Sequence, residues 1–344
     1  MIRFNCDYSE GAHPRIMDAL MRTNFEQTPG YGEDAHCENA ARMIRRLCGR
    51  EDIGVHFLVG GTQTNLTFLS AALKPYQGVI CAHTGHINTH ETGAIEATGH
   101  KVMAVEAADG LITEEMVRGM CRAHFEDATH EHMAMPGAVY ISDSSETGTV
   151  YTADMLHGLR KVCDEYGLIL YLDGARLGYA MAAPGNDVTP ALLAQLCDAF
   201  YIGGTKQGAM FGEALVIVNP DLNRNFRYMI KQRGGMLAKG RLLGIQFEEL
   251  MRDGLYMELS RHAVGQAMRI REAALKKGWR LSADSPTNQQ FFVAPNAELE
   301  RLSEKYAFSP MGVPGETESE IRICTSWATR AEDVDAIIAD IGKA

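Results

Sequence analysis

The sequence predicts an α/β protein in which helices cover a largely parallel central sheet, followed by a smaller C-terminal α+β domain. Between residues 55 and 218, short runs rich in β-branched and apolar residues alternate with segments of helical periodicity. Such alternation is typical of a parallel sheet with crossover helices. After Gly278 the order changes to strands followed by a closing helix. The length of 344 residues also favours about two domains.

Seven apolar runs are expected to form the central sheet, and three segments between them place apolar residues at the i, i+3, i+4 spacing of a sheet-covering helix. The expected strands are Val55–Val59, Val79–Ala82, Lys101–Val105, Ala138–Ser142, Leu168–Leu172, Ala199–Ile202 and Ala214–Val218. The expected helices are Thr62–Leu73, Glu114–Ala123 and Ala153–Tyr166.

The C-terminal part begins with a long stretch of helical pattern. From about Met236 to Lys277 the chain contains no proline and predicts long connecting helices. Strands are expected at Gln290–Ala294 and Ile321–Thr325, and a last helix at Ala331–Gly342. We therefore expect a large domain at residues 1–245, which includes the N-terminal segment, and a small α+β domain at residues 246–344.

Composition narrows the possible partners and location. The net charge of -11 argues against a nucleic-acid partner, since phosphate binding needs clustered Lys and Arg. No apolar stretch of about 18 residues predicts a membrane span, and the N-terminus lacks the apolar core of a signal peptide. The eight cysteines are scattered without a C-x-x-C pair, which favours reduced thiols. We expect a cytoplasmic protein.

Candidate functional residues follow three of the expected strands, because ligands of open α/β sheets bind beyond the carboxyl ends of strands. After Val55–Val59 come Gly60, Gly61 and Thr62 at the start of a helix. Glycines allow close backbone approach, and a helix N-terminus offers free N–H groups to a phosphate. A structural turn without a ligand has the same pattern, so this segment alone decides nothing.

A second strand, in LILYLDGARLG, ends in Asp173, with Arg176 three residues later. A carboxylate at the end of a buried strand is costly to desolvate without a cationic partner, which favours contact with a cofactor or substrate. The alternative is an Asp173–Arg176 pair that satisfies itself.

A third strand runs into Gly203, Gly204, Thr205 and Lys206. A lysine in a glycine-flanked turn between buried strands can be desolvated, which lowers its pKa and makes its amine a nucleophile toward an aldehyde. The alternative is a solvated loop lysine. Taken together, the three segments supply the anchors that pyridoxal 5'-phosphate (PLP) needs at its phosphate, its ring nitrogen and its aldehyde carbon.

These segments resemble the fold-type-I PLP enzymes, and more closely the threonine aldolase and β-eliminating lyase family. The resemblance covers essentially the whole chain. It includes FNCDYSEGAHP near the N-terminus, PGYGED at Pro29–Asp34, HINTHETGA at His86–Ala94 and RICTSWAT at Arg322–Thr329. The HIN, TKQGAMFGEA and TSWATRAEDVD stretches are similar to the phenylserine aldolase and low-specificity L-threonine aldolase branch.

The resemblance implies a role for each matching residue. It implies that Gly61 and Thr62 contact the phosphate and that His86 stacks on the pyridine ring. Asp173 would pair with the ring nitrogen and Lys206 would form the Schiff base. Thr205 and Arg176 would also lie at the cofactor. Substrate contacts are implied for Arg322, which would bind the carboxylate, and for Arg176, Tyr31 and Cys6. Cys6 stands where relatives carry a serine. Tyr31 and Asp34 would lie on an active-site loop that can reach a neighbouring subunit, and Lys231 and Arg233 are weaker candidates for phosphate contacts.

The implied reaction is cleavage of the Cα–Cβ bond of a β-hydroxy-α-amino acid such as L-threonine, L-allo-threonine or L-phenylserine, which yields glycine and an aldehyde. His86, or a water that it holds, would take the hydroxyl proton. A homodimer or homotetramer with shared active sites is also implied. A PLP-dependent β-eliminating lyase, or another PLP enzyme of amino acids, stays open because the lysine and aspartate are common to all of them.

A more remote alternative is a metallohydrolase. His83, His86 and His90 form an H-x-x-H-x-x-x-H pattern that can present three imidazoles on one helical face. Gly85 interrupts that helix, so no metal is expected.

The run Ser144-Ser145-Glu146 departs from the resemblance. Relatives usually carry a sequence with a histidine at this place, so one candidate base is missing.

Overall fold

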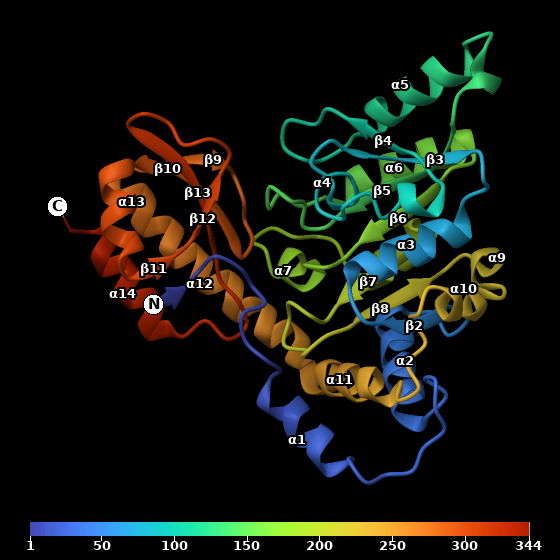
Figure 1. Ribbon diagram of the computed structural model, residues 1–344, viewed down its shortest axis with the longest axis horizontal. Coiled ribbons are helices and arrows are strands. Elements are labelled where there is room, and N and C mark those ends of the chain that lie inside the picture. Colours follow the sequence, from blue (N-terminus) through green and yellow to red (C-terminus); the bar gives the residue numbers. More distant parts are fainter. Residues whose placement is uncertain (344) are drawn as a thin grey trace.

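The structure, a computed structural model, describes residues 1–343. A seven-stranded sheet with helices on both faces forms the larger unit, and a four-stranded antiparallel sheet packed against helices forms the smaller one (Figure 1). The fold class expected from the sequence is confirmed.

The central sheet has the strand order β2-β8-β7-β6-β5-β3-β4. Its strands match all seven expected runs to within a few residues: β2 (Gly54–Leu58), β3 (Gln77–Ala82), β4 (Val102–Val105), β5 (Met135–Ser142), β6 (Ile169–Asp173), β7 (Ala199–Gly203) and β8 (Glu213–Ile217). From β7 to β4 all neighbours are parallel. Only β8 runs against both of its neighbours.

Side chains alternate between the two faces of this sheet, as the pleat of a strand requires. In β5, Ala138 and Tyr140 pack in the core on one face, and Val139 and Ile141 pack in the core on the other. The first core is covered by α3 (Gly61–Ala72), α4 (His86–Thr89), α9 (Pro220–Asn223) and α10 (Phe226–Gln232). The second is covered by α2 (Ala35–Cys48), α5 (Glu114–Phe125), α6 (Ala153–Tyr166), α8 (Pro190–Leu196) and α11 (Arg241–Met251).

The helix boundaries follow local capping. The Thr152 side chain accepts a hydrogen bond from the Met155 N–H and begins α6, and Gly167, with φ of 66°, ends it. Asp34 caps α2 in the same way by accepting from the Cys37 N–H at 2.9 Å. Within this chain the Asp34 side chain thus serves as a helix cap, and its implied place on an active-site loop stays a prediction.

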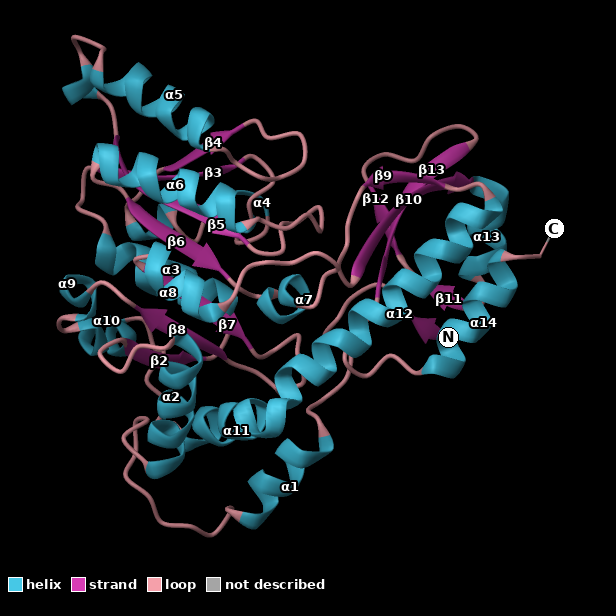
Figure 2. Cartoon of the chain, turned by 180° about the vertical axis from the view of Figure 1, so that it is seen from behind, coloured by secondary structure: helices cyan, strands magenta, loops and turns pink. Residues whose placement is uncertain are grey.

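The stretch expected to be helical from Met236 begins only at Arg241 and contains a break. A short 3₁₀ turn at Arg252–Gly254 separates α11 from α12 (Leu255–Lys277). Asp253 and Gly254 have φ of 56° and 75°, a left-handed conformation that interrupts an α-helix. Figure 2 shows the consequence: α11 stays with the large unit, and α12 runs from there into the small one.

The small unit contains an antiparallel sheet of order β12-β13-β10-β9, with β9 (Arg280–Ala283), β10 (Gln289–Pro295), β12 (Ser309–Met311) and β13 (Glu318–Cys324). Helices α13 (Asn296–Ser303) and α14 (Ala331–Ile341) cover it. A separate parallel pair joins β1 (Ile2–Arg3) to β11 (Tyr306–Ala307). Phe4 lies in this core beside Phe292 and Ile337.

These contacts bear on the division of the chain. The boundary expected between residues 245 and 246 falls inside α11, whose Phe247 and Leu250 belong to the core of the large unit. Residues 2–4 pack on the small unit instead. We propose that the division lies near Gly254 and that the N-terminus belongs to the small unit.

Two short helices complete the structure: α1 (Pro14–Arg22), which packs against α11, and α7 (Leu177–Met181), which packs against α12. Within residues 1–343, none of the helices has the length and apolar character that crossing a bilayer requires.

Candidate active site

The carboxyl ends of β5, β6 and β7 meet at one edge of the sheet, and Asp173 lies at the centre of this edge. Its side chain is buried and accepts hydrogen bonds from four donors. These are the hydroxyls of Tyr140 and Tyr201, the Asn65 amide and the Ala175 N–H, with distances of 2.6 Å to Tyr140 and 3.0 Å to both Asn65 and Ala175.

The charge state of Asp173 follows from these contacts. Burial works to raise its pKa, but the charge of His86 and the tyrosine hydroxyls outweigh burial and hold the pKa below its usual value. Within residues 1–343, no Lys or Arg nitrogen lies within 4 Å of Asp173, so the self-satisfied Asp173–Arg176 pair does not form. A buried carboxylate that no Lys or Arg pairs with is suited to a protonated ring nitrogen.

Lys206 lies in the turn between β7 and β8, whose backbone path depends on two glycines that follow the lysine. Gly208 and Gly212 have φ of 100° and 122°, where a side chain is strained. The Tyr179 hydroxyl donates to the Lys206 carbonyl and fixes the backbone. Burial, and next the positive charge of Arg176, hold the pKa of the Lys206 amine below its usual value. Both effects favour the neutral, nucleophilic form.

Thr205 and Glu213 brace the same turn. The Thr205 hydroxyl donates to Glu213 at 2.8 Å and accepts from the Gly212 N–H at 3.0 Å. The second carboxylate oxygen of Glu213 accepts from the Gly204 N–H at 3.0 Å. Burial raises the pKa of Glu213 to about 8. Thr205 is therefore committed to the turn that carries Lys206.

His86 begins α4 and is held from two sides. Its Nδ1 lies 2.8 Å from Oε1 of the buried Glu91, and its backbone N–H donates to Glu146 at 3.0 Å. Glu91 also accepts from Asn65, which links His86 to Asp173 through one amide. Burial would lower the pKa of His86, but the hydrogen bond to Glu91 and the charge of Asp173 outweigh it and raise the pKa.

Arg176 forms a bidentate ion pair with Asp7. Its Nε and a terminal nitrogen lie 2.7 and 3.1 Å from the two oxygens of Asp7, which also accepts from Asn288 at 2.9 Å. Burial works to raise the pKa of Asp7, but the charges of Arg176 and Lys206 outweigh it and lower the pKa to about 2. Asp7 is thus ionised and pairs with Arg176 across 169 residues.

Arg322, on β13, has no such partner. Its guanidinium donates to the Gln289 side chain and the Asn5 carbonyl, both at 3.1 Å. Its Nε is buried without a hydrogen-bond partner, and among residues 1–343 no carboxylate lies within 4 Å of it. A guanidinium left in this state is suited to a carboxylate ligand.

The start of α3 leaves backbone donors free. Its cap residue, Gly60, has no side chain to accept from the first N–H groups, which belong to Gly61, Thr62 and Gln63. A Cβ at Gly61 would lie 3.0 Å from the Tyr201 hydroxyl, the same hydroxyl that donates to Asp173. The helix start is therefore close to the aspartate. Arg233 lies beside it, because its carbonyl accepts from Gln63 at 3.2 Å.

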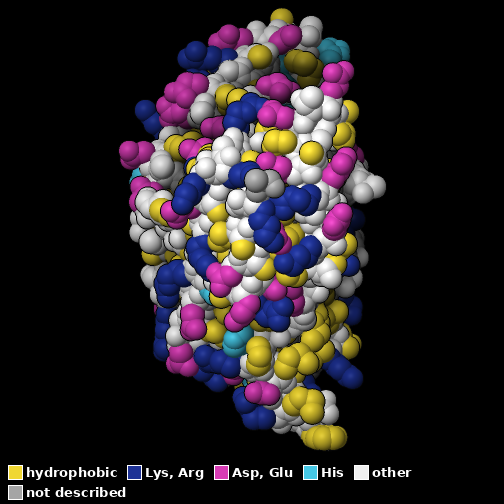
Figure 3. Space-filling model, turned by 90° about the vertical axis from the view of Figure 1, so that its left-hand side faces the viewer, with side chains coloured by type: hydrophobic (Ala, Val, Ile, Leu, Met, Phe, Trp, Pro, Cys, Tyr) yellow, Lys and Arg dark blue, Asp and Glu magenta, His cyan; other side chains and the backbone are white. Residues whose placement is uncertain are grey.

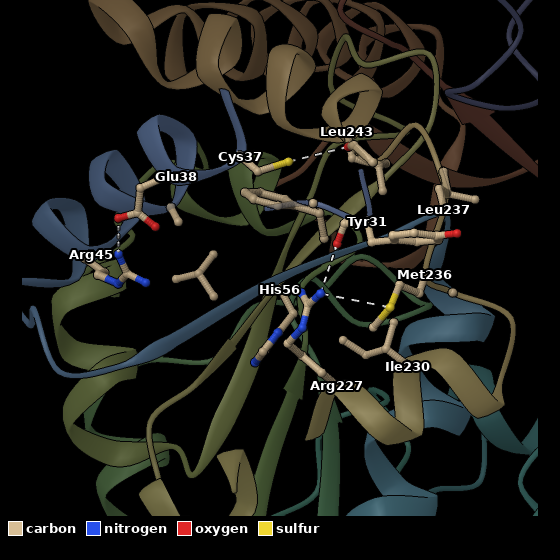
Figure 4. Close-up of a pocket in the computed structure, with 16 residues that line it drawn as sticks. Tyr31, Cys37, Glu38, Arg45, His56, Arg227, Ile230, Met236, Leu237 and Leu243 are labelled. Carbon is tan, nitrogen blue, oxygen red and sulfur yellow. Dashed lines mark hydrogen bonds and ion pairs between the residues drawn. The ribbon is translucent and has the colours of Figure 1, made fainter. Parts of the chain in front are cut away.

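Tyr31 lines a separate pocket of its own chain. It lines this pocket with His56, Arg227 and Met236, and its carbonyl accepts from Arg227 at 3.2 Å (Figure 4). Lys231 lies over the Tyr31 ring, 4.6 Å from its centre. None of Asp173, Lys206 and Arg322 lines this pocket.

Two further candidates have local partners. The thiol of Cys6, the residue before Asp7, lies 3.2 Å from the Ser9 hydroxyl.

The rings of His83 and His86 have different partners, since His83 accepts from the Ala107 N–H at 3.2 Å while His86 contacts Glu91. Over residues 1–343, no three His, Cys, Asp or Glu side chains are grouped closely enough to hold a metal ion.

Solved structures of known proteins share this arrangement of elements over 90% or more of their own length. A family model described as beta-eliminating lyase matches residues 6–297. The chain belongs to this family. The resemblance seen in the sequence is confirmed.

Individual relatives carry a more specific name. The low specificity L-threonine aldolases of a Pseudomonas strain and of Pseudomonas aeruginosa are each 31% identical, over 98% of this chain and 96% of theirs. The solved structure of Leishmania major threonine aldolase is 44% identical, with a TM-score of 0.97 over 99% of this chain and 98% of that one. An aspartate aminotransferase of Thermus thermophilus, 17% identical with a TM-score of 0.73, shares the fold.

The described residues of this β-eliminating lyase family member provide groups that suit PLP. Asp173 is a buried anion that no Lys or Arg of the described residues pairs with, and Lys206 is an amine with a lowered pKa. The uncapped start of α3 offers N–H groups near the same aspartate. PLP presents a ring nitrogen, an aldehyde and a phosphate, which match these three groups in charge and chemistry.

Sequence reasoning missed Asp7, Glu91, Asn65 and the two tyrosines of the Asp173 network. Asp7 and Glu91 lie inside the FNCDYSEGAHP and HINTHETGA segments, whose polar character was the only available signal. Tyr140 and Tyr201 lie within apolar strands, where a core role was the natural expectation.

Proposed function

We propose that this protein is a PLP-dependent aldolase that cleaves L-threonine, or a related β-hydroxy-α-amino acid, into glycine and an aldehyde. The observation that carries the proposal is that one sheet edge presents both a buried Asp173 carboxylate, with no Lys or Arg partner among the described residues, and a Lys206 amine of lowered pKa. The names of the relatives supply the reaction, since the lysine and aspartate are common to several PLP enzymes.

Three groups of this chain would hold the cofactor. Lys206 would bind its aldehyde carbon, Asp173 would pair with its ring nitrogen, and the N–H groups of Gly61 and Thr62 would bind its phosphate. When bound, PLP supplies a conjugated electron acceptor for the electron pair released when a bond at Cα breaks. The anionic form of Asp173 keeps the ring nitrogen protonated, which strengthens that acceptor.

Arg322 is the proposed carboxylate-binding residue. Hydrogen bonds to Gln289 and Asn5 hold the planar guanidinium in one orientation before any ligand arrives. Its Nε is left without a partner and can donate to a ligand. A bidentate contact with the substrate carboxylate would fix the rotation of the Cα substituents. Arg322 therefore decides which Cα bond is aligned for cleavage.

His86 is the proposed base for the β-hydroxyl proton. Its Nδ1 faces Glu91, so its Nε2 is left for the substrate or for a water. Glu91 stabilises the cationic ring that forms when Nε2 accepts the proton. The same contact fixes the ring orientation.

A homodimer or homotetramer with shared sites is part of the proposal. Tyr31 is about half exposed (46%) and lies outside its own chain's cluster. Met21 and Phe25 are 76% and 93% exposed on and after α1, and hydrophobic side chains gather at the lower end of the face shown in Figure 3. Such a patch is typical of a subunit interface. A cytoplasmic location is likewise proposed, since all eight cysteines are unpaired.

Product identification tests the proposed reaction. We expect the PLP-reconstituted protein to release glycine and acetaldehyde from L-threonine and from L-allo-threonine, and glycine and benzaldehyde from L-phenylserine if the pocket admits a phenyl group. Pyruvate and ammonia from L-serine, without glycine from any of these substrates, would instead assign the protein to the β-eliminating lyases.

A further inference from the structure

Glu146 comes shortly after β5 and contacts the last residue of that strand, Ser142. One of its carboxylate oxygens, Oε1, lies 2.8 Å from the Ser142 hydroxyl and accepts from the His86 N–H at 3.0 Å. The other oxygen, Oε2, forms no hydrogen bond within residues 1–343, and the residue is partly exposed. Glu146 therefore ties the start of α4 to the end of β5, at the sheet edge that carries Asp173.

A chain of three contacts leads from Glu146 to Asp173. Oε1 of Glu146 lies 2.8 Å from the Ser142 hydroxyl, and that hydroxyl lies 3.3 Å from the hydroxyl of Tyr140. Tyr140 in turn lies 2.6 Å from Asp173. Each hydroxyl has a single hydrogen to donate. Tyr140 gives its hydrogen to the ionised Asp173, so a hydrogen between Ser142 and Tyr140 can come only from Ser142.

The hydrogens available to this chain depend on whether Glu146 carries a proton. If Glu146 is ionised, Ser142 donates to it at the shorter distance, and the contact between Ser142 and Tyr140 contains no hydrogen. If Glu146 is protonated at Oε1, it donates to Ser142, Ser142 donates to Tyr140, and each of the three contacts contains one hydrogen. The geometry therefore favours the protonated form, in which every hydrogen of the chain is directed toward Asp173.

The charges around Glu146 favour the same form. Among residues 1–343, no Lys or Arg nitrogen lies within 4 Å of its carboxylate. Burial raises the pKa of Glu146 and the charge of Asp173 adds to this, which together outweigh the hydrogen bond to Ser142 and the charge of His86. Two carboxyl groups in one network separate in this way into an ionised and a protonated member. The titratable groups that share this environment are Asp173, His86, Tyr140, Tyr151, Cys81 and Arg176.

Resting on the cofactor site proposed above, we propose that Glu146 is a positioning residue that holds a proton in the active form of the site and orients the Ser142 and Tyr140 hydroxyls toward Asp173. Ionisation of Glu146 reverses the Ser142 hydroxyl and adds a second negative charge to the network of Asp173. The reaction requires the same site to take up an electron pair when a bond at Cα breaks, so the added charge slows it. Activity therefore falls as pH rises through the pKa of Glu146.

Infrared spectroscopy of the cofactor-free protein tests the protonation directly. A protonated carboxylic acid has a C=O stretch separate from that of a carboxylate, and exposed Asp and Glu side chains are ionised at pH 7. The wild-type spectrum at pH 7 should contain a protonated-acid band that is absent from Glu146→Gln. Asp143 and Glu213, whose pKa values burial raises to about 7 and about 8, contribute to both spectra and cancel in the difference.

The pH dependence of kcat tests the consequence. Between pH 7 and pH 9.5 the wild type should lose about ten times more activity than Glu146→Gln, whose amide cannot ionise, as expected for one unit charge acting on charge that develops in the same site. The variant removes no charge at low pH, so the rise of activity on the acidic side should stay at the wild-type pH. Glu106→Gln, at a side chain that is 90% exposed, is the matched control and should move neither side.

Three results would overturn the inference: infrared spectra without a band difference, an equal alkaline loss in both proteins, or an acidic side that shifts in Glu146→Gln. If Glu146→Gln does not fold, Ser142→Ala decides in its place. Removing the acceptor of the Glu146 proton should shift a protonated-acid band, and unmoved bands would contradict the proposal. The infrared measurements need neither cofactor nor turnover, so they can fail while the aldolase activity stands, or hold while that activity fails.

Discussion

His86 Nδ1 lies 2.8 Å from the buried carboxylate of Glu91, and the same carboxylate oxygen accepts from Asn65. One glutamate thus fixes the orientation of the imidazole and connects it to the amide that contacts Asp173. Such a contact adjusts both the protonation and the direction of a catalytic base.

The Glu91→Gln variant should shift the pH dependence of kcat. Glu91 contributes to the raised pKa of His86, so removing its charge lowers that pKa. If neutral His86 is the base, activity rises as pH increases through the His86 pKa, and this rise should move to lower pH in the variant. A kcat profile between pH 5 and 9 measures it. An unmoved acidic limb would mean that His86 is not the titrating group, and Glu96→Gln, on the nearby surface, serves as the control.

Arg322→Gln should raise KM for threonine and also lower kcat, because Arg322 is proposed both to bind the carboxylate and to orient the bonds at Cα. Hydrogen bonds to charged groups contribute about 1.5–3 kcal/mol each, so KM for threonine should rise about 10- to 100-fold. Arg280→Gln, which removes an exposed arginine of the same antiparallel sheet, is the matched control. An unchanged KM in Arg322→Gln would contradict the proposed carboxylate contact.

Asp173→Asn should reduce kcat without abolishing cofactor binding. The amide fits the same site but cannot hold a ring nitrogen in its protonated state, so we expect a loss of about 100- to 1000-fold, as for other lost electrostatic contacts to developing charge. Fluorescence or absorbance titration with PLP measures binding, and single-turnover kinetics measures the chemical step. A kcat within a few fold of the wild type would remove Asp173 from the mechanism.

Asp143→Asn should change how stability depends on pH. Burial raises the pKa of Asp143 to about 7, and one of its carboxylate oxygens has no partner. A folded-state pKa above the unfolded value near 4 means that the folded protein binds the extra proton, so this group's contribution to stability falls as pH rises from about 4 to 7. At pH 8 the buried charge of Asp143 lowers the free energy of unfolding by on the order of 4 kcal/mol, and the variant lacks this charge. The unpaired amide that replaces it lowers the free energy of unfolding by about 1–3 kcal/mol at any pH.

Urea unfolding at pH 5 and pH 8 checks this. The difference in unfolding free energy between Asp143→Asn and the wild type should become more favourable to the variant at pH 8. Asp221→Asn, at an exposed position, should show no such change. A difference that is the same at both pH values would mean that Asp143 keeps an ordinary pKa.

The sequence predicted those features that depend on local pattern. The seven strands of the sheet follow from apolar runs. Asp173 was identified because it ends one such run, and Lys206 because it follows another after a glycine-rich turn. Arg322 was identified by resemblance alone, since nothing around it in the sequence distinguishes it from a surface arginine.

Features that depend on distant pairing were not predicted. The partner of Arg176 is Asp7, 169 residues away, and no periodicity links them. The sequence placed a substrate contact at Cys6, one residue earlier, where relatives have a serine. Tyr140 and Tyr201 are strand residues by pattern, and only the register of β5, β6 and β7 brings their hydroxyls to one carboxylate.

The break between α11 and α12 at Asp253 was not predicted, for a different reason. Asp and Gly are tolerated near helix ends and in turns, and the apolar pattern continues on both sides of them. Without a proline, periodicity alone does not separate one long helix from two.

The central claim is that Lys206 carries the cofactor. Borohydride reduction of the PLP-reconstituted protein, followed by proteolysis and mass spectrometry, tests it most directly, with exposed Lys276→Ala and the Lys206→Ala variant run alongside. The account predicts one pyridoxyl-phosphate modification per chain on the peptide that contains Lys206, retained in Lys276→Ala and absent from Lys206→Ala. Stoichiometric modification of another lysine, or none in a protein that still cleaves threonine, would contradict it.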